Sequence, residues 1–275
     1  MSEMKKSYVG VSGVVSPEMQ ATLEGLAMKT ELFSKNRFLA LGVKATHKTQ
    51  YDDDENKYGK EWYPVGEEGF NGALRHDYPS HFTKAVAQTY LEITKVGDEE
   101  YRKEFVKQIH ERGQPWLQGI QFDMLPWHDN DDMLGFLEYV KASTGLELFL
   151  QAHGGAMTEL QPKGIIQRLG AYAQFVDYLL FDASHGTGKR LDVDALEPFI
   201  AEAYSGLDTS QTGIAIAGGL NGDVIREELP ELIAAYPNLS WDAEGQLHPY
   251  NEAGKRPLDM TITEDYLQAS ASLLR

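Results

Sequence analysis

The sequence contains no cysteine among its 275 residues. It therefore has no disulfide framework, no thiolate metal site and no cysteine nucleophile, and we expect a reducing, cytoplasmic setting. It also lacks any run of about 18 apolar residues, so we expect no membrane-spanning helix. Its first residues lack the continuous apolar stretch and the cleavage site of a signal peptide.

Positive charge is scarce. Lysine and arginine number 25 against 42 aspartates and glutamates, which gives a formal net charge of -17. Such a field repels a phosphate backbone and an anionic lipid surface, so we expect neither nucleic acid nor a membrane as a partner. A site for a small anion has to be built locally, from backbone amides and helix ends.

Apolar runs of strand length alternate with helical patterns along the chain, a signature of βαβ units and a buried parallel sheet. The length suits one such barrel of about 250 residues. We therefore predict an α/β fold, a single (β/α)₈ TIM barrel over residues 1–275. The eight expected strands span residues 7–15, 37–45, 85–93, 117–125, 146–151, 176–182, 212–218 and 239–243. The helices that are easiest to recognise span residues 17–33, 98–113, 131–143, 164–175, 192–205 and 222–236.

Two segments are less clear. The strand at 85–93 follows from the need for eight strands, because the same residues also suit a helix. Residues 46–82 are polar, rich in glycine and far longer than a median loop. They follow the carboxyl end of a strand, where barrel enzymes carry active-site loops, so we interpret them as an inserted lid. A decorative or oligomerising insertion is the alternative, and a homo-oligomer stays open. We expect solvated loop at 51–56 and 63–69.

A buried strand ending in Asp182 leads directly into the glycine-rich sequence ASHGTGK, which contains Gly188. We include Gly188 among the candidate phosphate-binding residues. A nucleotide-binding P-loop would need glycine at position 183 and serine or threonine at position 190. This chain has Ala183 and Arg190, so that motif is excluded.

Two further turns favour an anion. Gly218 and Gly219 end a strand, and Asn221 precedes a helix, so free backbone amides can approach a bound anion. The next strand is followed by Gly245, and turns after the seventh and eighth strands commonly hold phosphate in barrels. A plain tight turn is the alternative for residues 217–225.

Polar residues gather at the ends of several strands, which converge on one pocket in a barrel. A pair of them could transfer protons, although a lone aspartate at a strand end is often only a helix cap. We expect no cofactor and no metal, because the histidines and carboxylates lack a metal-binding spacing. The strand-end residues are Gln121, Asp123, Gln151, His153, Asp182, Asp242 and Glu244, and the metal alternative would use His153, Asp182, His185, Asp242 and His248.

Lys44 lies near the end of the second strand. It could form a Schiff base with a carbonyl substrate, as in barrel aldolases. We interpret it instead as a surface lysine.

The ordered motifs VGVSGVVSPEMQA, FDASHGTGKRLD, AGGLNGDVI and WDAEG resemble those of phosphoribosylanthranilate isomerase. The likeness covers the last 100 residues or so and the first 25. It implies a cytoplasmic enzyme of tryptophan biosynthesis that acts on a small phosphorylated sugar derivative by acid and base catalysis.

The resemblance also implies roles for individual residues. Asp182 matches the general acid of the family, and Ser12 stands where the family has a cysteine base. His153 or another carboxylate would then be the base, because a serine hydroxyl is a poor one. Asp242 and Gly245 fall in one phosphate turn. Gly218, Gly219 and Asn221 fall in the other.

Ser12 and Glu244 depart from the family pattern, because a carboxylate in a phosphate site repels its ligand. They favour an alternative function, a divergent barrel that binds a phosphorylated ligand without isomerase activity. A lyase or aldolase that uses Lys44 is a further alternative.

Overall fold

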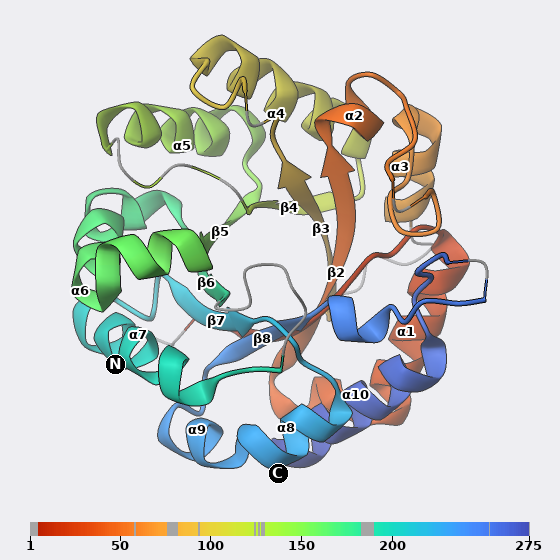
Figure 1. The fold of residues 1–275 in the computed structure, drawn as a ribbon, viewed down its shortest axis with the longest axis vertical. Helices are drawn as coiled ribbons and strands as arrows, with labels where there is room; N and C mark the ends of the chain where they lie inside the picture. The colour runs from red at the N-terminus through yellow and green to blue at the C-terminus, as the bar shows by residue number, and fades with distance from the viewer. Residues whose placement is uncertain are drawn as a thin grey trace.

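Eight parallel strands close into one barrel in the order β1-β2-β3-β4-β5-β6-β7-β8, and helices surround it (Figure 1). The structure is a computed structural model. It describes residues 5–57, 59–75, 82–92, 94–123, 125, 127, 130–182, 190–252 and 254–274. The predicted single (β/α)₈ barrel is confirmed.

Each expected strand is present within a few residues of its predicted ends. The strands are β1 (Ser7–Ser12), β2 (Arg37–Thr46), β3 (Thr83–Tyr90), β4 (Leu117–Phe122), β5 (Glu147–His153), β6 (Tyr178–Asp182), β7 (Gly213–Ala217) and β8 (Ser240–Ala243). The α-helices are α1 (Pro17–Lys29), α2 (His47–Gln50), α3 (Gly66–Leu74), α4 (Glu99–Gly113), α5 (Asn130–Thr144), α6 (Gly154–Tyr172), α7 (Val193–Gly206), α8 (Gly222–Glu228), α9 (Pro230–Ala235) and α10 (Met260–Leu273). Short 3₁₀ helices are η1 (Leu32–Lys35), η2 (Ala173–Phe175) and η3 (Gly245–Leu247).

Alternation along the strands divides the buried residues into two layers, because successive side chains point to opposite faces of a sheet. One set, exemplified by Val9 and Leu39, belongs to the large cluster between the strands and the helices. The other set fills the barrel interior with a separate cluster. Its members are Tyr8, Phe38, Ala40, Val86, Phe149, Tyr178, Leu180 and Ala215.

Aromatic rings form the floor of the interior. Tyr8 lies 5.5 Å from Phe38 and 5.2 Å from Tyr178 between ring centroids, and Phe149 stacks on Tyr178 at 4.6 Å. All four residues lie in the first half of their strands. The floor therefore closes the amino-terminal end of the barrel and leaves its carboxyl end for polar groups.

Two glycines make room inside the barrel for polar side chains of neighbouring strands. A Cβ on Gly10 would lie 2.5 Å from Asp242 Oδ1, and one on Gly42 would lie 2.6 Å from the carboxamide carbon of Gln88. Both separations are far below van der Waals contact. Glycine at these positions therefore allows Asp242 and Gln88 to lie flat against the β1 and β2 backbones.

The segment between β2 and β3 contains a helix that we expected to be loop. The predicted solvated loop at 63–69 was wrong, because Tyr63 is buried and residues 66–69 belong to α3. Phe70, Ala73 and Leu74 of this helix are buried. The long insertion is not confirmed, because α3 stands where each unit of the barrel has its helix. A lid function for residues 46–82 stays a prediction.

The expected helix at 222–236 is divided into α8 and α9 at Pro230, which cannot donate the hydrogen bond of a continuous helix. The helical alternative for residues 85–93 was wrong, since β3 pairs with both β2 and β4. Among the helices that the structure describes, none is long and apolar enough to cross a membrane.

We expect Gly10→Ala to destabilise the protein by roughly 1–3 kcal/mol, because the added methyl group overlaps Asp242 and the strand backbone cannot move away. The measurement is urea unfolding followed by circular dichroism. Gly25→Ala is the matched control. A methyl group on Gly25, in α1, would have no atom within 4 Å, so alanine there should stabilise by about 0.5–1 kcal/mol. Equal stability of the two variants would contradict this account of the barrel interior.

Candidate functional site

The inward face of the strands becomes polar towards the carboxyl end of the barrel. Tyr8 and Ser12 lie on the same face of β1, and Phe38 and Lys44 lie on the same face of β2, by the two-residue period of a strand. Most predicted strand-end residues therefore meet above the aromatic floor. The resulting polar layer comprises Ser12, Lys44, Gln88, Tyr90, Gln121, Asp123, Gln151, Asp182, Asp242 and Glu244.

Asp242 is held by two donors from other strands. The Ser12 hydroxyl lies 3.2 Å from Asp242 Oδ1 and 3.3 Å from Oδ2, and Gln88 Nε2 donates to Oδ2 at 3.1 Å. Gln88 Nε2 also lies 2.6 Å from Ser12 Oγ. Asp242 is 8% exposed and Ser12 is fully buried. Ser12 is thus placed to orient the carboxyl group of Asp242.

Lys44 is fully buried, so its interpretation as a surface lysine was wrong. Its Nζ lies 2.7 Å from Glu244 Oε1 and donates to the Tyr90 hydroxyl at 2.6 Å. The Glu244 side chain is 34% exposed, whereas that of Lys44 is fully buried. Glu244 therefore neutralises an interior cation.

Hydrogen bonds continue from Lys44 across four further strands. Asp123 bonds to the Tyr90 hydroxyl and accepts from Gln121 Nε2 at 2.7 Å. Gln121 Nε2 also reaches Gln151 Oε1 at 3.3 Å, and Gln151 Nε2 donates to Asp182 Oδ2 at 3.2 Å. The network runs from Glu244, after β8, through side chains of β2, β3, β4 and β5 to Asp182 at the end of β6.

Burial changes the protonation of this layer. It raises the pKa of Asp242 to about 7, with the charge of Glu244 adding to the rise and Lys44 opposing it. It raises the pKa of Asp123 to about 6, against the opposing effect of Lys44. Burial lowers the pKa of Lys44, but the charge of Glu244 more than offsets this, and the pKa lies above its usual value. Near neutral pH, Lys44 therefore stays protonated, while the carboxyl groups of Asp123 and Asp242 can take up and release protons.

His153 ends β5 and caps the following helix, with its Nδ1 accepting from Ala156 N at 3.4 Å. Gly188 and His185 lie outside the described residues. His248 is buried directly after η3, and its Nε2 lies 2.8 Å from the Ser12 carbonyl oxygen. Among the described residues, no group of three histidines, aspartates or glutamates is arranged to hold a metal ion.

The segment after β2 docks beside this layer through aromatic contacts. Trp62 stacks on His248 with ring centroids 4.6 Å apart, and the Arg256 guanidinium lies 4.6 Å from the Trp62 ring centroid. Gly13, at φ 89°, allows this approach, since a Cβ there would overlap the His248 ring. Trp62, in the segment after β2, thus contacts the loop that follows β8.

The two predicted phosphate turns share one pocket of about 570 Å³, which Asn221 and Gly245 both line. The Asn221 side chain caps α8 by accepting from Val224 N at 3.0 Å. Gly218 and Gly219 have positive φ angles of 101° and 67°, which the turn requires.

Carboxylates also line this pocket. Asp223 and Asp265 border it, and a Cβ on Gly222 would overlap Asp265 Oδ2, so a carboxylate already faces the start of α8. Asp242 lies inside the barrel and does not line the pocket. Arg256 lines the pocket as well, and its guanidinium donates to the carbonyl oxygens of Gly245 and His248. Phosphate binding at these turns stays a prediction.

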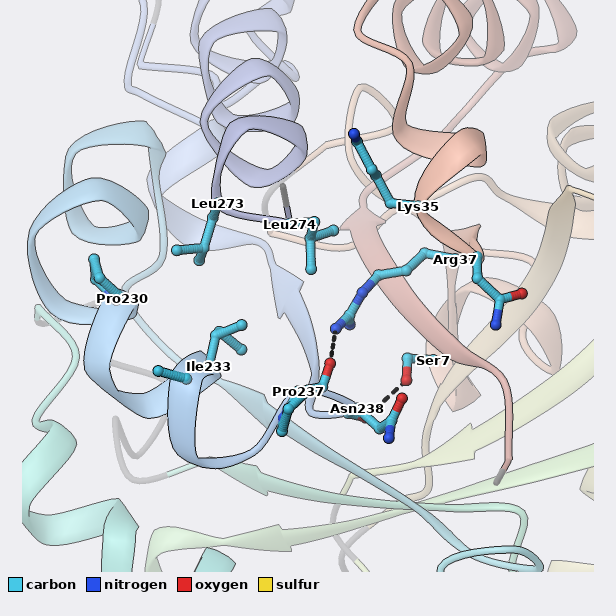
Figure 2. A pocket seen from close by; sticks show the side chains of 11 residues that line it. Ser7, Lys35, Arg37, Pro230, Ile233, Pro237, Asn238, Leu273 and Leu274 are labelled. Carbon is cyan, nitrogen blue, oxygen red and sulfur yellow. Dashed lines mark hydrogen bonds between the residues drawn. The ribbon is translucent and has the colours of Figure 1, made fainter. Parts of the chain in front are cut away.

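A second pocket, of about 430 Å³, opens at the opposite, amino-terminal end of the barrel, beside Ser7 and Arg37 (Figure 2). The Arg37 guanidinium donates to the carbonyl oxygens of Pro237 and Leu239 at 2.7 and 2.5 Å. No predicted site residue lines this pocket, and barrel enzymes carry their chemistry at the other end.

Gln88 and Tyr90 were missed by the sequence analysis. Both lie on β3, where the uncertain assignment of residues 85–93 hid them. The signal was present, because Val86, Gln88 and Tyr90 share one face of a strand, and that face continues the apolar interior into polar residues.

No protein-family model and no curated protein sequence matches the chain. Solved structures do match it. A tryptophan synthase alpha chain from Legionella pneumophila has a TM-score of 0.57 and 15% identity, over 98% of this chain and 92% of its own. A mutant tryptophan synthase alpha subunit from Pyrococcus furiosus has a TM-score of 0.50 and 15% identity, over 100% and 96%. A β-1,4-mannanase has a TM-score of 0.51 and 9% identity, over 98% and 99%.

These likenesses show the fold alone. The predicted membership of the phosphoribosylanthranilate isomerase family was wrong, because the matching structures are tryptophan synthase alpha chains and other barrel enzymes. The predicted isomerase activity was wrong as well. Tryptophan synthesis is connected with this chain only through the names of the similar structures. The motifs misled because glycine turns and strand-end aspartates are properties that unrelated barrels share.

We expect Asp242→Asn to stabilise the protein increasingly as the pH rises. The folded protein holds the Asp242 proton up to about pH 7, whereas the unfolded chain releases it near pH 4. The stability due to the neutral carboxyl is therefore fully present below pH 4 and is lost as the pH rises through 7. A permanently neutral asparagine avoids that loss, so the gain should grow from pH 5 to pH 8, up to about 4 kcal/mol.

Urea unfolding at pH 5, 6, 7 and 8 measures this gain. The exposed Glu197 on α7 provides the control variant Glu197→Gln, which should show no comparable trend. A gain that is constant or shrinks towards pH 8 would contradict the raised pKa of Asp242.

Proposed function

We propose that the chain is an aldolase-type lyase that works by general acid and base catalysis, without a Schiff base. The observation that carries this proposal is the presence of Asp123 and Asp242, two buried carboxyl groups whose pKa values are raised towards neutrality, in the same polar layer as the Lys44 ammonium. The site lies at the carboxyl ends of the strands, where barrel enzymes have their active sites.

Lys44 supports electrostatic catalysis and disfavours covalent catalysis. A Schiff base requires an unprotonated amine, and the pKa of Lys44 is raised by the charge of Glu244 in spite of burial. An ammonium in a buried site instead stabilises negative charge that develops on a substrate oxygen. Glu244 is partly exposed, so a substrate oxygen can reach Lys44 by taking the place of that carboxylate.

The two carboxyl groups supply the proton transfers. In a retro-aldol step, a carboxylate removes the proton from a hydroxyl group at the carbon β to a carbonyl. The bond between the α and β carbons breaks, a new carbonyl forms at the β carbon, and the electron pair moves into an enolate. The other carboxyl group then protonates the α carbon, and Lys44 stabilises the enolate oxygen meanwhile. Groups with pKa values near the working pH perform both transfers well.

Enolate formation can be tested without knowing the natural substrate. We expect the protein to exchange α hydrogens of small hydroxyketones, such as dihydroxyacetone, for deuterium in D₂O, as followed by proton NMR. Asp242→Asn, Asp123→Asn and Lys44→Met should each lower the exchange rate by a factor of about 100 or more, the usual contribution of one acid, base or oxyanion donor. Glu197→Gln should not change it.

Borohydride gives the complementary result. Treatment of the protein with dihydroxyacetone and borohydride should leave Lys44 unmodified in a mass spectrum of its peptides. A reduced adduct on Lys44 would contradict the proposed mechanism, and exchange that persists in Asp242→Asn and Asp123→Asn would show that these carboxyl groups do not transfer the protons. The exchange rate should also change between pH 6 and 7, with apparent pKa values that belong to the coupled pair.

A further inference from the structure

At the mouth of the barrel, carboxyl groups outnumber cationic groups among the described side chains of the polar layer. Within the described residues, the polar layer contains the carboxyl groups of Asp123, Asp182, Asp242 and Glu244, and a single ammonium, that of Lys44. Glu244 already pairs with that ammonium at 2.7 Å. The whole chain adds a net charge of -17. Among the described side chains of the layer, a phosphate group therefore meets four carboxyl groups and one ammonium, which it can reach only by displacing a carboxylate.

The side chain of Gln88 lacks a hydrogen-bond donor for its carbonyl oxygen. Its Nε2 donates to both Ser12 and Asp242, while its Oε1 is buried and has no hydrogen-bond partner. Gln88 is only 2% exposed, so bulk water does not solvate that oxygen. An unpaired buried acceptor destabilises the folded protein, because it has lost its hydrogen bonds to water. A ligand that donates a hydrogen bond to Gln88 Oε1 removes that cost.

An uncharged ligand with several hydroxyl groups fits both the excess of carboxyl groups and the unpaired oxygen of Gln88. Its hydroxyl groups can donate to Gln88 Oε1 and to carboxylates such as Glu244 and Asp182, while it brings no negative charge. A phosphorylated ligand supplies acceptor oxygens and repulsive charge to a layer that already has an excess of both.

We propose that the site takes an uncharged, polyhydroxylated carbonyl compound and selects against its phosphorylated counterpart. This inference rests on the proposed function for the carbonyl group, and on the acceptor-rich layer for the hydroxyl groups. It replaces the small phosphorylated metabolite that the sequence motifs suggested.

Binding of two unreactive probes tests the selection separately from catalysis. Xylitol and xylitol 5-phosphate carry the same hydroxylated chain and differ by one phosphate. Saturation-transfer NMR with the full chain at pH 7.5 should give an affinity for xylitol at least about tenfold higher than that for its phosphate, a gap that narrows as salt screens the carboxylates. Glu197→Gln is the control and should leave the ratio unchanged.

Glu244→Gln removes the carboxylate that occupies Lys44 and should lower the ratio by about tenfold, because the ammonium then becomes available to phosphate. Gln88→Leu removes the unpaired acceptor and should weaken xylitol binding without improving binding of the phosphate. Circular dichroism and the unfolding midpoint of each variant show whether it is folded before binding is compared.

Equal or tighter binding of xylitol 5-phosphate to the unmodified protein would overturn the inference, and so would binding of neither probe. If hydroxyketones show no deuterium exchange while xylitol still binds in preference to its phosphate, the lyase function fails and the selection stands. If exchange occurs and the phosphorylated substrate is preferred, the selection fails and the lyase function stands.

Discussion

Side chains at the axis of an eight-stranded barrel are poorly hydrated. The rest of the polar layer depends on one constraint, which is that the Lys44 ammonium is buried there. An unpaired charge in such a place is very costly, so a partner of opposite charge has to lie in contact with it. Glu244 supplies that partner from the end of β8. Once the pair is formed, Asp123 and Asp242 lie beside charges of both signs in a poorly hydrated space, and their pKa values rise towards neutrality. The acid and base character of the site thus follows from the burial of these two carboxyl groups, which the charge of Lys44 only partly offsets.

The space that these groups need comes from the strands opposite them. Gly10 and Gly42 have no side chain to compete with Asp242 and Gln88, and the aromatic floor below them prevents the polar groups from sinking further into the barrel. Hydrogen bonds from Ser12 and Gln88 then hold the Asp242 carboxyl group in one orientation. A carboxyl group held in this way needs little rearrangement during a proton transfer, which is a property of preorganised sites.

Particular elements show how far the sequence predicts this molecule. The strands at 146–151, 176–182 and 212–218 are short apolar runs bounded by helical patterns, so both their type and their position were clear. The helix α3 was missed because Gly66, Gly69 and Gly72 weaken its helical signal, while burial of Phe70 and Leu74 against the barrel stabilises it regardless. Propensity is a local property, and packing against the rest of the chain overrides it.

The candidate site was predicted in part. Asp123, Asp182, Asp242 and Glu244 were recognisable as strand-end residues, and so were Gln121 and Gln151, which donate to Asp123 and Asp182. Ser12 was named only through the family resemblance, and Gln88 and Tyr90 were missed. Asp242 was assigned to a phosphate turn on the basis of a family resemblance, whereas its position on the inward face of β8 directs it to Ser12 and Gln88.

The sequence by itself determined the alternation of strands and helices, the polar character of the strand ends and the acidity of the chain, because these depend only on composition and on residue order over short stretches. Only the tertiary structure decided that Lys44 pairs with Glu244 and that Ser12 and Gln88 meet Asp242. These residues come from β1, β2, β3 and β8. They come together because the barrel closes between its first and last strands, and the resulting loss of water turns ordinary polar residues into groups with altered protonation.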